Sequence, residues 1–361
     1  MYNFSRMIIM IYTILFIVSC GSSPSNINYK IYDFRECESI LLSELFMSEK
    51  PNYMELEDPD SIWLSTPSIV KSRGEYIAVC QPFGPMSGVW LYDVKGGYLG
   101  RLGNIGRGPG EYIFPKDVLF SPSGDMLYVV DGGNSNILSY TTCDRKFQET
   151  QPFPLYAMSV TVDPYNGDFV WYVSNVNSAS NNRKYKTIVR TTTEGKTLEK
   201  TVPVEQLDCY SGMWQIISNF HDSSNVCMAH HQFQPEIFST EVGDDSIIKL
   251  QFENHKFPPI SFAWGADNFR ELISSSPYIQ YYDVFQTSHL LYVRFGVGGN
   301  IYIGVYDKRK QYGCYCSVSN IEDDLGIGVI PRIKGVQNDR FYFTVTPEQS
   351  NYVTVPMLVN I

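Results

Sequence analysis

The sequence lacks the motifs by which most enzymes and nucleic-acid-binding proteins are recognised. It has neither a Gly-x-Ser-x-Gly nucleophile elbow nor a His-Glu-x-x-His zinc motif, and its 361 residues include only 5 histidines. Lys and Arg number 28 against 38 Asp and Glu, which gives a net charge of −10, and no basic cluster is present. These deficits argue against nucleic acid or anionic lipid as the main partner, and they predict no cofactor.

Long hydrophobic runs are also scarce. Met7–Val18 follows Arg6 and is too short to span a bilayer comfortably, which is typical of a secretory signal peptide. Its ending, Ile17-Val-Ser-Cys20, resembles a bacterial lipobox, in which the cysteine thiol is acylated and cleavage precedes the cysteine. An ordinary cleaved signal is the alternative. We expect a signal peptide at residues 1–19, a lipidated Cys20, a flexible tether to residue 30, and one domain over residues 31–361.

Metal-binding patterns are weak. Seven cysteines remain after Cys20, and their odd number and scattered positions suggest no disulfide framework. Cys314 and Cys316 share a strand face, but zinc would need two further ligands from elsewhere. His230 and His231 are adjacent in a predicted strand and therefore point to opposite faces. We predict no metal site.

What the sequence does contain is β structure with aromatic packing. Hydrophobic residues make up 43% and aromatic residues 14%, as in a well-packed globular protein. Only residues 36–49 and 266–275 have the periodicity of short helices. Elsewhere, strand-like runs alternate with Gly, Pro, Asn and Asp turns.

The strand-like runs repeat. Six apolar landmarks in these runs are separated by 51, 42, 56, 65 and 51 residues. The landmarks are Ile77, Tyr128, Val170, Val226, Leu291 and Tyr342. This spacing predicts an all-β, six-bladed β-propeller of four-stranded antiparallel blades; five or seven blades would also be compatible with it. A β-sandwich would not repeat a unit at this interval.

The clearest copy is blade two, over about residues 103–150. A glycine-rich loop precedes predicted strands at Lys116–Phe120, Met126–Val130 and Asn136–Tyr140. The segment Gly103–Tyr140 resembles an NHL-type propeller repeat. More closely, GRLGNIGRGPGEY resembles the signature of the six-bladed β-propeller lipoproteins of Bacteroidetes. The resemblance implies a fold and a place in the cell envelope, anchored to the outer membrane and facing the periplasm or the surface. It implies no particular activity.

The turns of blade two supply the candidate ligand site. In an antiparallel blade, the loop that enters the first strand lies on the same face as the turn between the second and third strands. We therefore expect five residues to converge near one mouth of the central channel, where loops vary over a rigid scaffold. They are Arg107, Glu111, Tyr112, Asp131 and Asn134. The alternative is that Arg107 and Glu111 pair locally, while the glycines only permit a tight crossing between blades.

Three other features have simpler explanations. The glycine cluster lacks the following Lys-Ser/Thr and helix that a phosphate loop needs, which excludes nucleotide binding. Asp163–Gly167 resembles an aspartate box with the wrong spacing, and it is expected to be a turn. The aromatic residues around Tyr278–Phe285 could offer a glycan platform, although packing between blades is the expected role.

The sequence therefore predicts a lipid-anchored binding or scaffolding module whose partner is an envelope protein, a peptide or a glycan. The alternative function is a carbohydrate-active hydrolase or lyase with its site at the central channel mouth. Such an enzyme would need two carboxylates from different blades, which sequence spacing cannot reveal.

Overall fold

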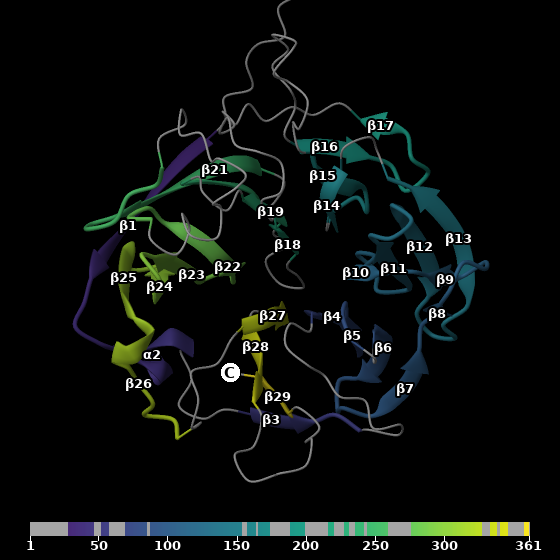
Figure 1. Ribbon diagram of the computed structural model, residues 1–361, viewed down its shortest axis with the longest axis horizontal. Coiled ribbons are helices and arrows are strands. Elements are labelled where there is room, and N and C mark those ends of the chain that lie inside the picture. The colour runs from purple at the N-terminus through teal and green to yellow at the C-terminus, as the bar shows by residue number, and fades with distance from the viewer. Residues whose placement is uncertain are drawn as a thin grey trace, which may run out of the picture.

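The structure, a computed structural model, describes residues 28–46, 52–57, 69–84, 87–153, 157–163, 165–173, 188–198, 216–219, 227–230, 235–241, 244–258, 276–326, 333–337, 340–345 and 357–360. The described residues are mostly strands, arranged as six blades around a central axis (Figure 1). This confirms the six-bladed β-propeller. The signal peptide, Cys20 and the expected helix at residues 266–275 lie outside the described residues.

Blades one to three are antiparallel meanders whose strands follow the order of the sequence. Blade one consists of β4 (Ile69–Arg73), β5 (Tyr76–Gln81), β6 (Gly88–Asp93) and β7 (Tyr98–Arg101). Blade two consists of β10 (Pro115–Phe120), β11 (Met126–Asp131), β12 (Asn136–Thr141) and β13 (Phe147–Pro152). Blade three consists of β14 (Ala157–Val162), β15 (Phe169–Val173), β16 (Ile188–Thr191) and β17 (Thr197–Leu198).

Blades four to six complete the ring. Blade four consists of β18 (Ile216–Asn219), β19 (Cys227–His230), β20 (Glu236–Glu241) and β21 (Asp244–Phe252). Blade five consists of β22 (Gln280–Gln286), β23 (Leu290–Val297), β24 (Asn300–Asp307) and β25 (Tyr312–Ser317), followed by a 3-10 turn (Val318–Asn320). Blade six consists of β27 (Ile333–Gln337), β28 (Arg340–Val345) and β29 (Met357–Asn360), with β3 added from the N-terminal part of the chain.

The repeat spacing identified the second strand of the blades correctly. Five of the landmarks lie in β5, β11, β15, β23 and β28, and Val226 lies directly before β19, outside the described residues. The turns that precede β5, β11 and β15 contain Gly74, Gly124 and Gly167 at φ of 56°, 79° and 79°. Glycine adopts this left-handed backbone readily, whereas other residues are strained there.

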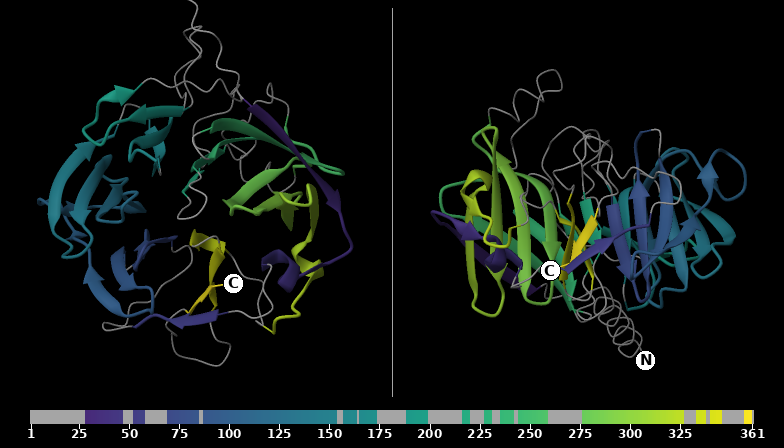
Figure 2. Two further views of the ribbon diagram at one scale, coloured as in Figure 1. Left: turned by 180° about the vertical axis from the view of Figure 1, so that it is seen from behind. Right: turned by 90° about the horizontal axis from the view of Figure 1, so that it is seen from below.

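The N-terminal part of the chain forms a strap around the outside of the ring. The N-terminal strap consists of β1 (Asn28–Glu36), β2 (Ile40–Leu41), α2 (Leu42–Phe46) and β3 (Asn52–Glu55). β1 runs parallel between β21 and β25 and joins blades four and five into one nine-stranded sheet (Figures 1 and 2). β2 pairs with β26 (Ile321–Glu322), and β3 pairs with β29 and closes the ring.

Two expectations about this segment are wrong. Residues 28–30, expected in the tether, belong to β1 because they pair with Ser246–Ile248 of β21. The expected helix over residues 36–49 does not begin until Leu42, because Glu36 and Ile40–Leu41 instead pair with strands of blade five and with β26; residues 47–49 lie outside the described residues. These pairing partners lie more than 200 residues away, as the contact between Glu36 and Glu253 at a separation of 217 illustrates.

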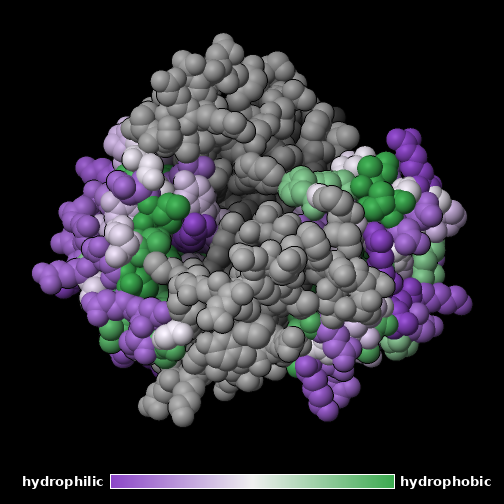
Figure 3. Space-filling model, turned by 60° about the horizontal axis from the view of Figure 1, so that its bottom comes forward, coloured by the Kyte–Doolittle hydropathy of each residue, from purple (hydrophilic) through white to green (hydrophobic). Residues whose placement is uncertain are grey.

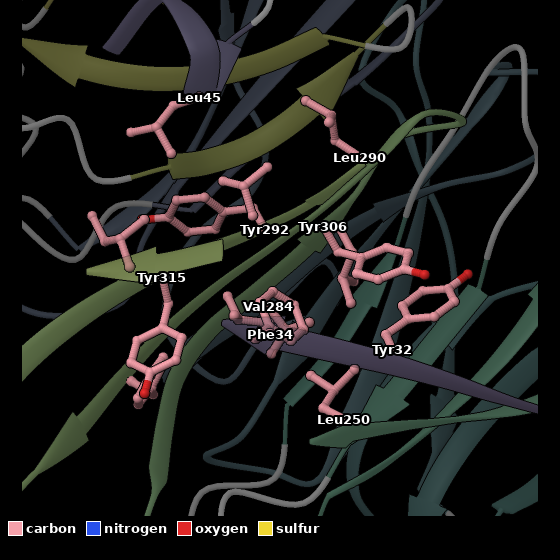
Figure 4. Close-up of a cluster of buried hydrophobic side chains, with 14 of the residues drawn as sticks. Tyr32, Phe34, Leu45, Leu250, Val284, Leu290, Tyr292, Tyr306 and Tyr315 are labelled. Carbon is pink, nitrogen blue, oxygen red and sulfur yellow. The ribbon is translucent and has the colours of Figure 1, made fainter. Parts of the chain in front are cut away.

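The strap contributes aromatic side chains to the largest hydrophobic core (Figure 4). The ring of Tyr32 stacks on Tyr306 with a centroid distance of 4.0 Å, and Phe34 stacks on Phe252 at 4.8 Å. Gly304 and Gly313 of blade five make room for Phe34, since a Cβ at either position would lie 3.1–3.2 Å from its ring. Close approach of this kind is a common reason for glycine inside a strand.

Candidate functional site

The glycine-rich loop of blade two lies over the outer strands of that blade, away from the channel. It contains β8 (Asn104–Ile105) and β9 (Glu111–Tyr112), which pair with each other (Figure 1). The Tyr140 hydroxyl, on β12, donates a hydrogen bond of 2.9 Å to the Gly110 carbonyl. A Cβ on Gly110 would lie 2.9 Å from Phe147 of β13. The loop therefore rests on β12 and β13 before the chain turns inward to β10.

Tyr112 and Glu111 hold this loop in its conformation. Tyr112 is fully buried; its hydroxyl donates to the Leu102 carbonyl at 2.8 Å and accepts from the Val89 N–H at 3.1 Å. Burial raises the pKa of the Tyr112 hydroxyl. The Glu111 carboxylate accepts a hydrogen bond of 2.8 Å from the Gly108 N–H. Tyr112 thus ties blade one to the loop, and Glu111 shapes the loop itself.

Asp131 connects the loop to the turn between β11 and β12. It is fully buried, and its carboxylate accepts hydrogen bonds from the N–H groups of Ile113 at 3.2 Å and Phe114 at 2.9 Å. It also accepts from the Gly133 N–H at 2.9 Å and from the Asn134 side-chain amide at 2.8 Å. Loop and turn therefore lie on one face of the disc, which we name the loop face.

The five candidate residues do not form one open cluster at the channel mouth. Tyr112 and Asp131 are buried, and Glu111 is half-buried within its loop, whereas Arg107 and Asn134 are exposed. In the described part of the chain, no acceptor for Arg107 is found, and Glu111 does not pair with it. The expected convergence is wrong for a physical reason: the connection starts at the outer strand β7 and packs on Tyr140 and Phe147 first.

A second group of residues, which the sequence did not reveal, borders the channel. The innermost strands β10, β14, β22 and β27 each contain a β-bulge near their start, on the loop face. The residues inserted into the strand register by these bulges are Lys116, Met158, Tyr282 and Lys334. A bulge redirects a side chain and is frequent beside functional sites. Its position depends on the register with the neighbouring strand, which no local sequence signal specifies.

The bulge in blade five has a defined polar environment. The Arg294 guanidinium lies 5.6 Å from the ring centroid of Tyr282, and its Nη1 lies 3.3 Å from Oδ2 of Asp283. Both charged side chains are partly accessible, at 22% and 12%. Gly296 makes room for the Tyr282 ring, because a Cβ there would lie 2.9 Å from the ring carbons. The site is therefore a cation held against an aromatic face and a carboxylate.

The innermost strands are positively charged although the whole chain is acidic. In their described residues, Lys71, Arg73, Lys116 and Lys334 outnumber Asp117 and Asp283. Lys334 is buried in blade six, whose inner strand β27 neighbours β22 and packs closely on β4, where Gly335 faces the Val70 carbonyl. Burial lowers the pKa of Lys116 and raises the pKa of Asp117.

The remaining predicted features form turns or packing contacts. Asp163 caps its turn by accepting from the Tyr165 N–H at 2.9 Å, and it forms a buried ion pair with Arg190. Tyr281 is fully buried against Phe257, with ring centroids 5.2 Å apart. Within the described ranges, no cluster of three or more His, Cys, Asp or Glu residues could hold a metal ion, and no helix has the length and hydropathy to cross a bilayer.

The sheet topology defines the class as a six-bladed β-propeller, and the described residues at the sides of the disc are largely hydrophilic (Figure 3). The profile of the DUF5128 family, described as 6-bladed beta-propeller, matches residues 21–341, and the chain belongs to this family. No protein of curated function matches it.

Two solved structures from Bacteroides are similar. A Bacteroides fragilis NCTC 9343 protein described as exported is 17% identical, with a TM-score of 0.73, over 92% of this chain and 99% of its own. A member of the DUF4221 family from Bacteroides vulgatus ATCC 8482 is 10% identical, with a TM-score of 0.58, over 87% and 96%. At these identities the likeness establishes the fold alone.

Proposed function

We propose that this propeller is an extracytoplasmic binding module, held to the cell envelope by a lipid on Cys20, that takes an acidic peptide segment of an envelope protein on its loop face. One observation carries the proposal: the innermost strands bulge on that face, and in blade five the bulge holds the partly accessible guanidinium of Arg294 against Tyr282 and Asp283. A guanidinium that is partly accessible attracts negatively charged partners even in an acidic protein.

The ligand class follows from the arrangement of Tyr282 and Arg294. A sugar would need the open face of the aromatic ring, but the guanidinium of Arg294 already lies over it. The guanidinium itself offers a planar set of donors that suits carboxylates. Asp283 and Tyr282 hold Arg294 in place, so little side-chain freedom is lost when a carboxylate binds.

The loop-face rim supplies a second contact in this proposal. Arg107 and Asn134 are exposed on the same face, at a larger radius than the bulges. An extended peptide that crosses blade two from the channel outward would meet both. Tyr112, Glu111 and Asp131 support this surface without contacting the ligand.

The carbohydrate-active alternative depends on paired carboxylates. Inverting and retaining glycosidases place them about 5–9 Å apart. Asp117 has a pKa raised by burial, as a general acid requires, but its carboxylate accepts from the N–H of Val118 at 2.8 Å. Asp283, three blades away, is paired with Arg294. The described inner strands therefore favour binding over hydrolysis.

The proposal can be tested with the mature protein on arrays of acidic, basic and neutral peptides and of acidic and neutral glycans. We expect binding to acidic peptides that weakens as salt rises, because surface charge pairs are screened. Selective binding of neutral glycans, or an Arg294→Ala variant that binds acidic peptides as tightly as the wild type, would contradict it.

A further inference from the structure

Three thiols meet where the N-terminal strap crosses blade five. Cys37 directly follows β1, and Cys314 and Cys316 lie on β25. The Cys37 N–H donates to the Tyr315 carbonyl at 3.0 Å, and its thiol contacts the same carbonyl at 3.3 Å across 278 residues of sequence. The thiols of Cys314 and Cys316 lie close enough to Cys37 to influence its pKa. All three are free thiols in this structure.

The strand register decides which pair can be bridged. β1 and β25 are parallel with Glu36 opposite Tyr315, so the next residue, Cys37, stands opposite Cys316. Neighbouring strands lie about 4.8 Å apart, which falls inside the range of about 4.4–6.8 Å between Cα atoms that disulfides require. Cys314 is two residues further along, a rise of about 6.6 Å. The resulting diagonal of about 8 Å exceeds the limit for a disulfide.

We propose that Cys37 and Cys316 form a disulfide outside the cytoplasm and that this bond fastens the N-terminal strap to blade five. Cys314, two residues before Cys316, remains a free thiol. The proposal rests on export of the chain and not on the ligand. The bond would fix β1, which pairs with β21 of blade four, covalently to β25 of blade five.

The three thiols differ in pKa, and this difference decides which of them attacks first. Burial raises the pKa of Cys37, and burial together with the neighbouring Cys37 raises those of Cys314 and Cys316 to about 12. The neighbouring Cys314 and Cys316 oppose the rise in the pKa of Cys37, so Cys37 provides the attacking thiolate.

The oxidant is a disulfide, RSSR, of a small thiol or of an oxidoreductase. The Cys37 thiolate attacks one sulfur of RSSR, which forms a mixed disulfide and releases RS⁻. Cys316 then loses its proton and attacks the Cys37 sulfur, which releases the second RS⁻. The two protons given up by the protein thiols leave as two RSH, so the protein has lost two electrons and two protons and RSSR has gained them.

The bond can be mapped in the full mature chain, purified from an oxidising compartment or equilibrated with excess oxidised glutathione. Free thiols are alkylated under denaturing conditions before digestion with chymotrypsin, which cleaves after Tyr315 and separates Cys314 from Cys316. We expect a linked peptide pair that contains Cys37 and Cys316, with Cys314 alkylated. Alkylation of all three thiols, or a bridge from Cys37 to any other cysteine, would overturn the proposal.

Two matched variants complete the test. Cys314→Ser should retain the linked pair, and Cys316→Ser should lose it. If Cys316→Ser folds poorly, the wild type itself decides the matter: reduction should lower its Tm by several degrees, and the same shift should occur in Cys314→Ser. If the wild-type protein carries the disulfide and its Tm does not change on reduction, the bond does not stabilise the attachment of the strap to blade five.

Discussion

The carboxylate of Asp131 accepts a hydrogen bond of 2.9 Å from the N–H of Phe114, and thereby joins the turn after β11 to the loop that leads into β10. The same carboxylate serves Ile113, Gly133 and Asn134, and it is fully buried. A residue that sequence reasoning selected as a ligand contact is thus an anchor that holds two connections together. The ligand surface is built above it from exposed neighbours.

Replacement of Asp131 by Ala should therefore lower stability. Three backbone N–H groups would lose a charged acceptor, and we expect the free energy of unfolding to fall by about 3 kcal/mol. Urea unfolding of the two proteins measures the difference. Asn134→Ala is the matched control, because it removes one exposed donor to the same carboxylate and should cost less than about 1 kcal/mol. Equal effects of the two substitutions would refute the anchoring role.

The strap offers a second pair of variants on one strand. Phe34 is 1% exposed and packs on Phe252 in the space left by Gly304 and Gly313, whereas Tyr29 is 62% exposed. Phe34→Ala should lower the free energy of unfolding by about 3–5 kcal/mol. Tyr29→Ala should change it by less than about 0.5 kcal/mol. A small loss for Phe34→Ala would mean that β1 is dispensable for joining blades four and five.

The repeat of the blades could be predicted because each repeat has a recognisable local sequence pattern. Each second strand is an apolar run directly after a turn such as Gly124-Asp125, so spacing alone located five described second strands. The N-terminal strap could not be found in this way. β1 pairs with strands more than 200 residues away, and its sequence alone does not distinguish a pairing strand from a tether.

The site was only partly predictable for the same reason. Alternation of turns placed the glycine-rich loop and Asp131 on one face, and the structure agrees. The distance of the glycine-rich loop from the channel axis could not be predicted from the sequence, because it depends on the packing of Tyr140 and Phe147 against Gly110. For the strap, the only local indication in the described strands is that Gly304 and Gly313 leave space for another side chain, which Phe34 fills.

Low pH should expose the role of Asp125 in the turn between β10 and β11. Hydrogen bonds from Ser123 and Ser121, the latter at 2.7 Å, lower the pKa of Asp125 below its ordinary value of 3.8. A depressed carboxyl pKa stabilises the fold above the unfolded-state pKa, and the contribution is lost as pH falls through the folded-state pKa. The stability advantage of the wild type over Asp125→Asn should therefore be constant near neutral pH and shrink below pH 3.8. Urea unfolding across this range checks it, and an advantage that grows with acidity would be the contrary result.

Two arginines of the loop face, the partly accessible Arg294 and the exposed Arg107, distinguish a ligand at the channel from a ligand at the rim. Arg294 is fixed by Asp283 at 3.3 Å and lies over Tyr282, while Arg107 stands on the loop that covers the outer strands of blade two. For an acidic peptide seated at the channel mouth, Arg294→Ala should raise Kd at least tenfold, which corresponds to about 1.4 kcal/mol. Arg294→Lys should recover only part of this, since an ammonium lacks the planar donor pair.

Arg107→Ala should leave Tm unchanged, because no described residue pairs with Arg107. Its effect on Kd then reports how far the peptide extends over blade two. Complete loss of binding in Arg107→Ala together with wild-type binding in Arg294→Ala would move the ligand from the channel to the rim. Titration calorimetry of both variants at two salt concentrations distinguishes the cases, because loss of a charged contact also weakens the dependence of Kd on salt.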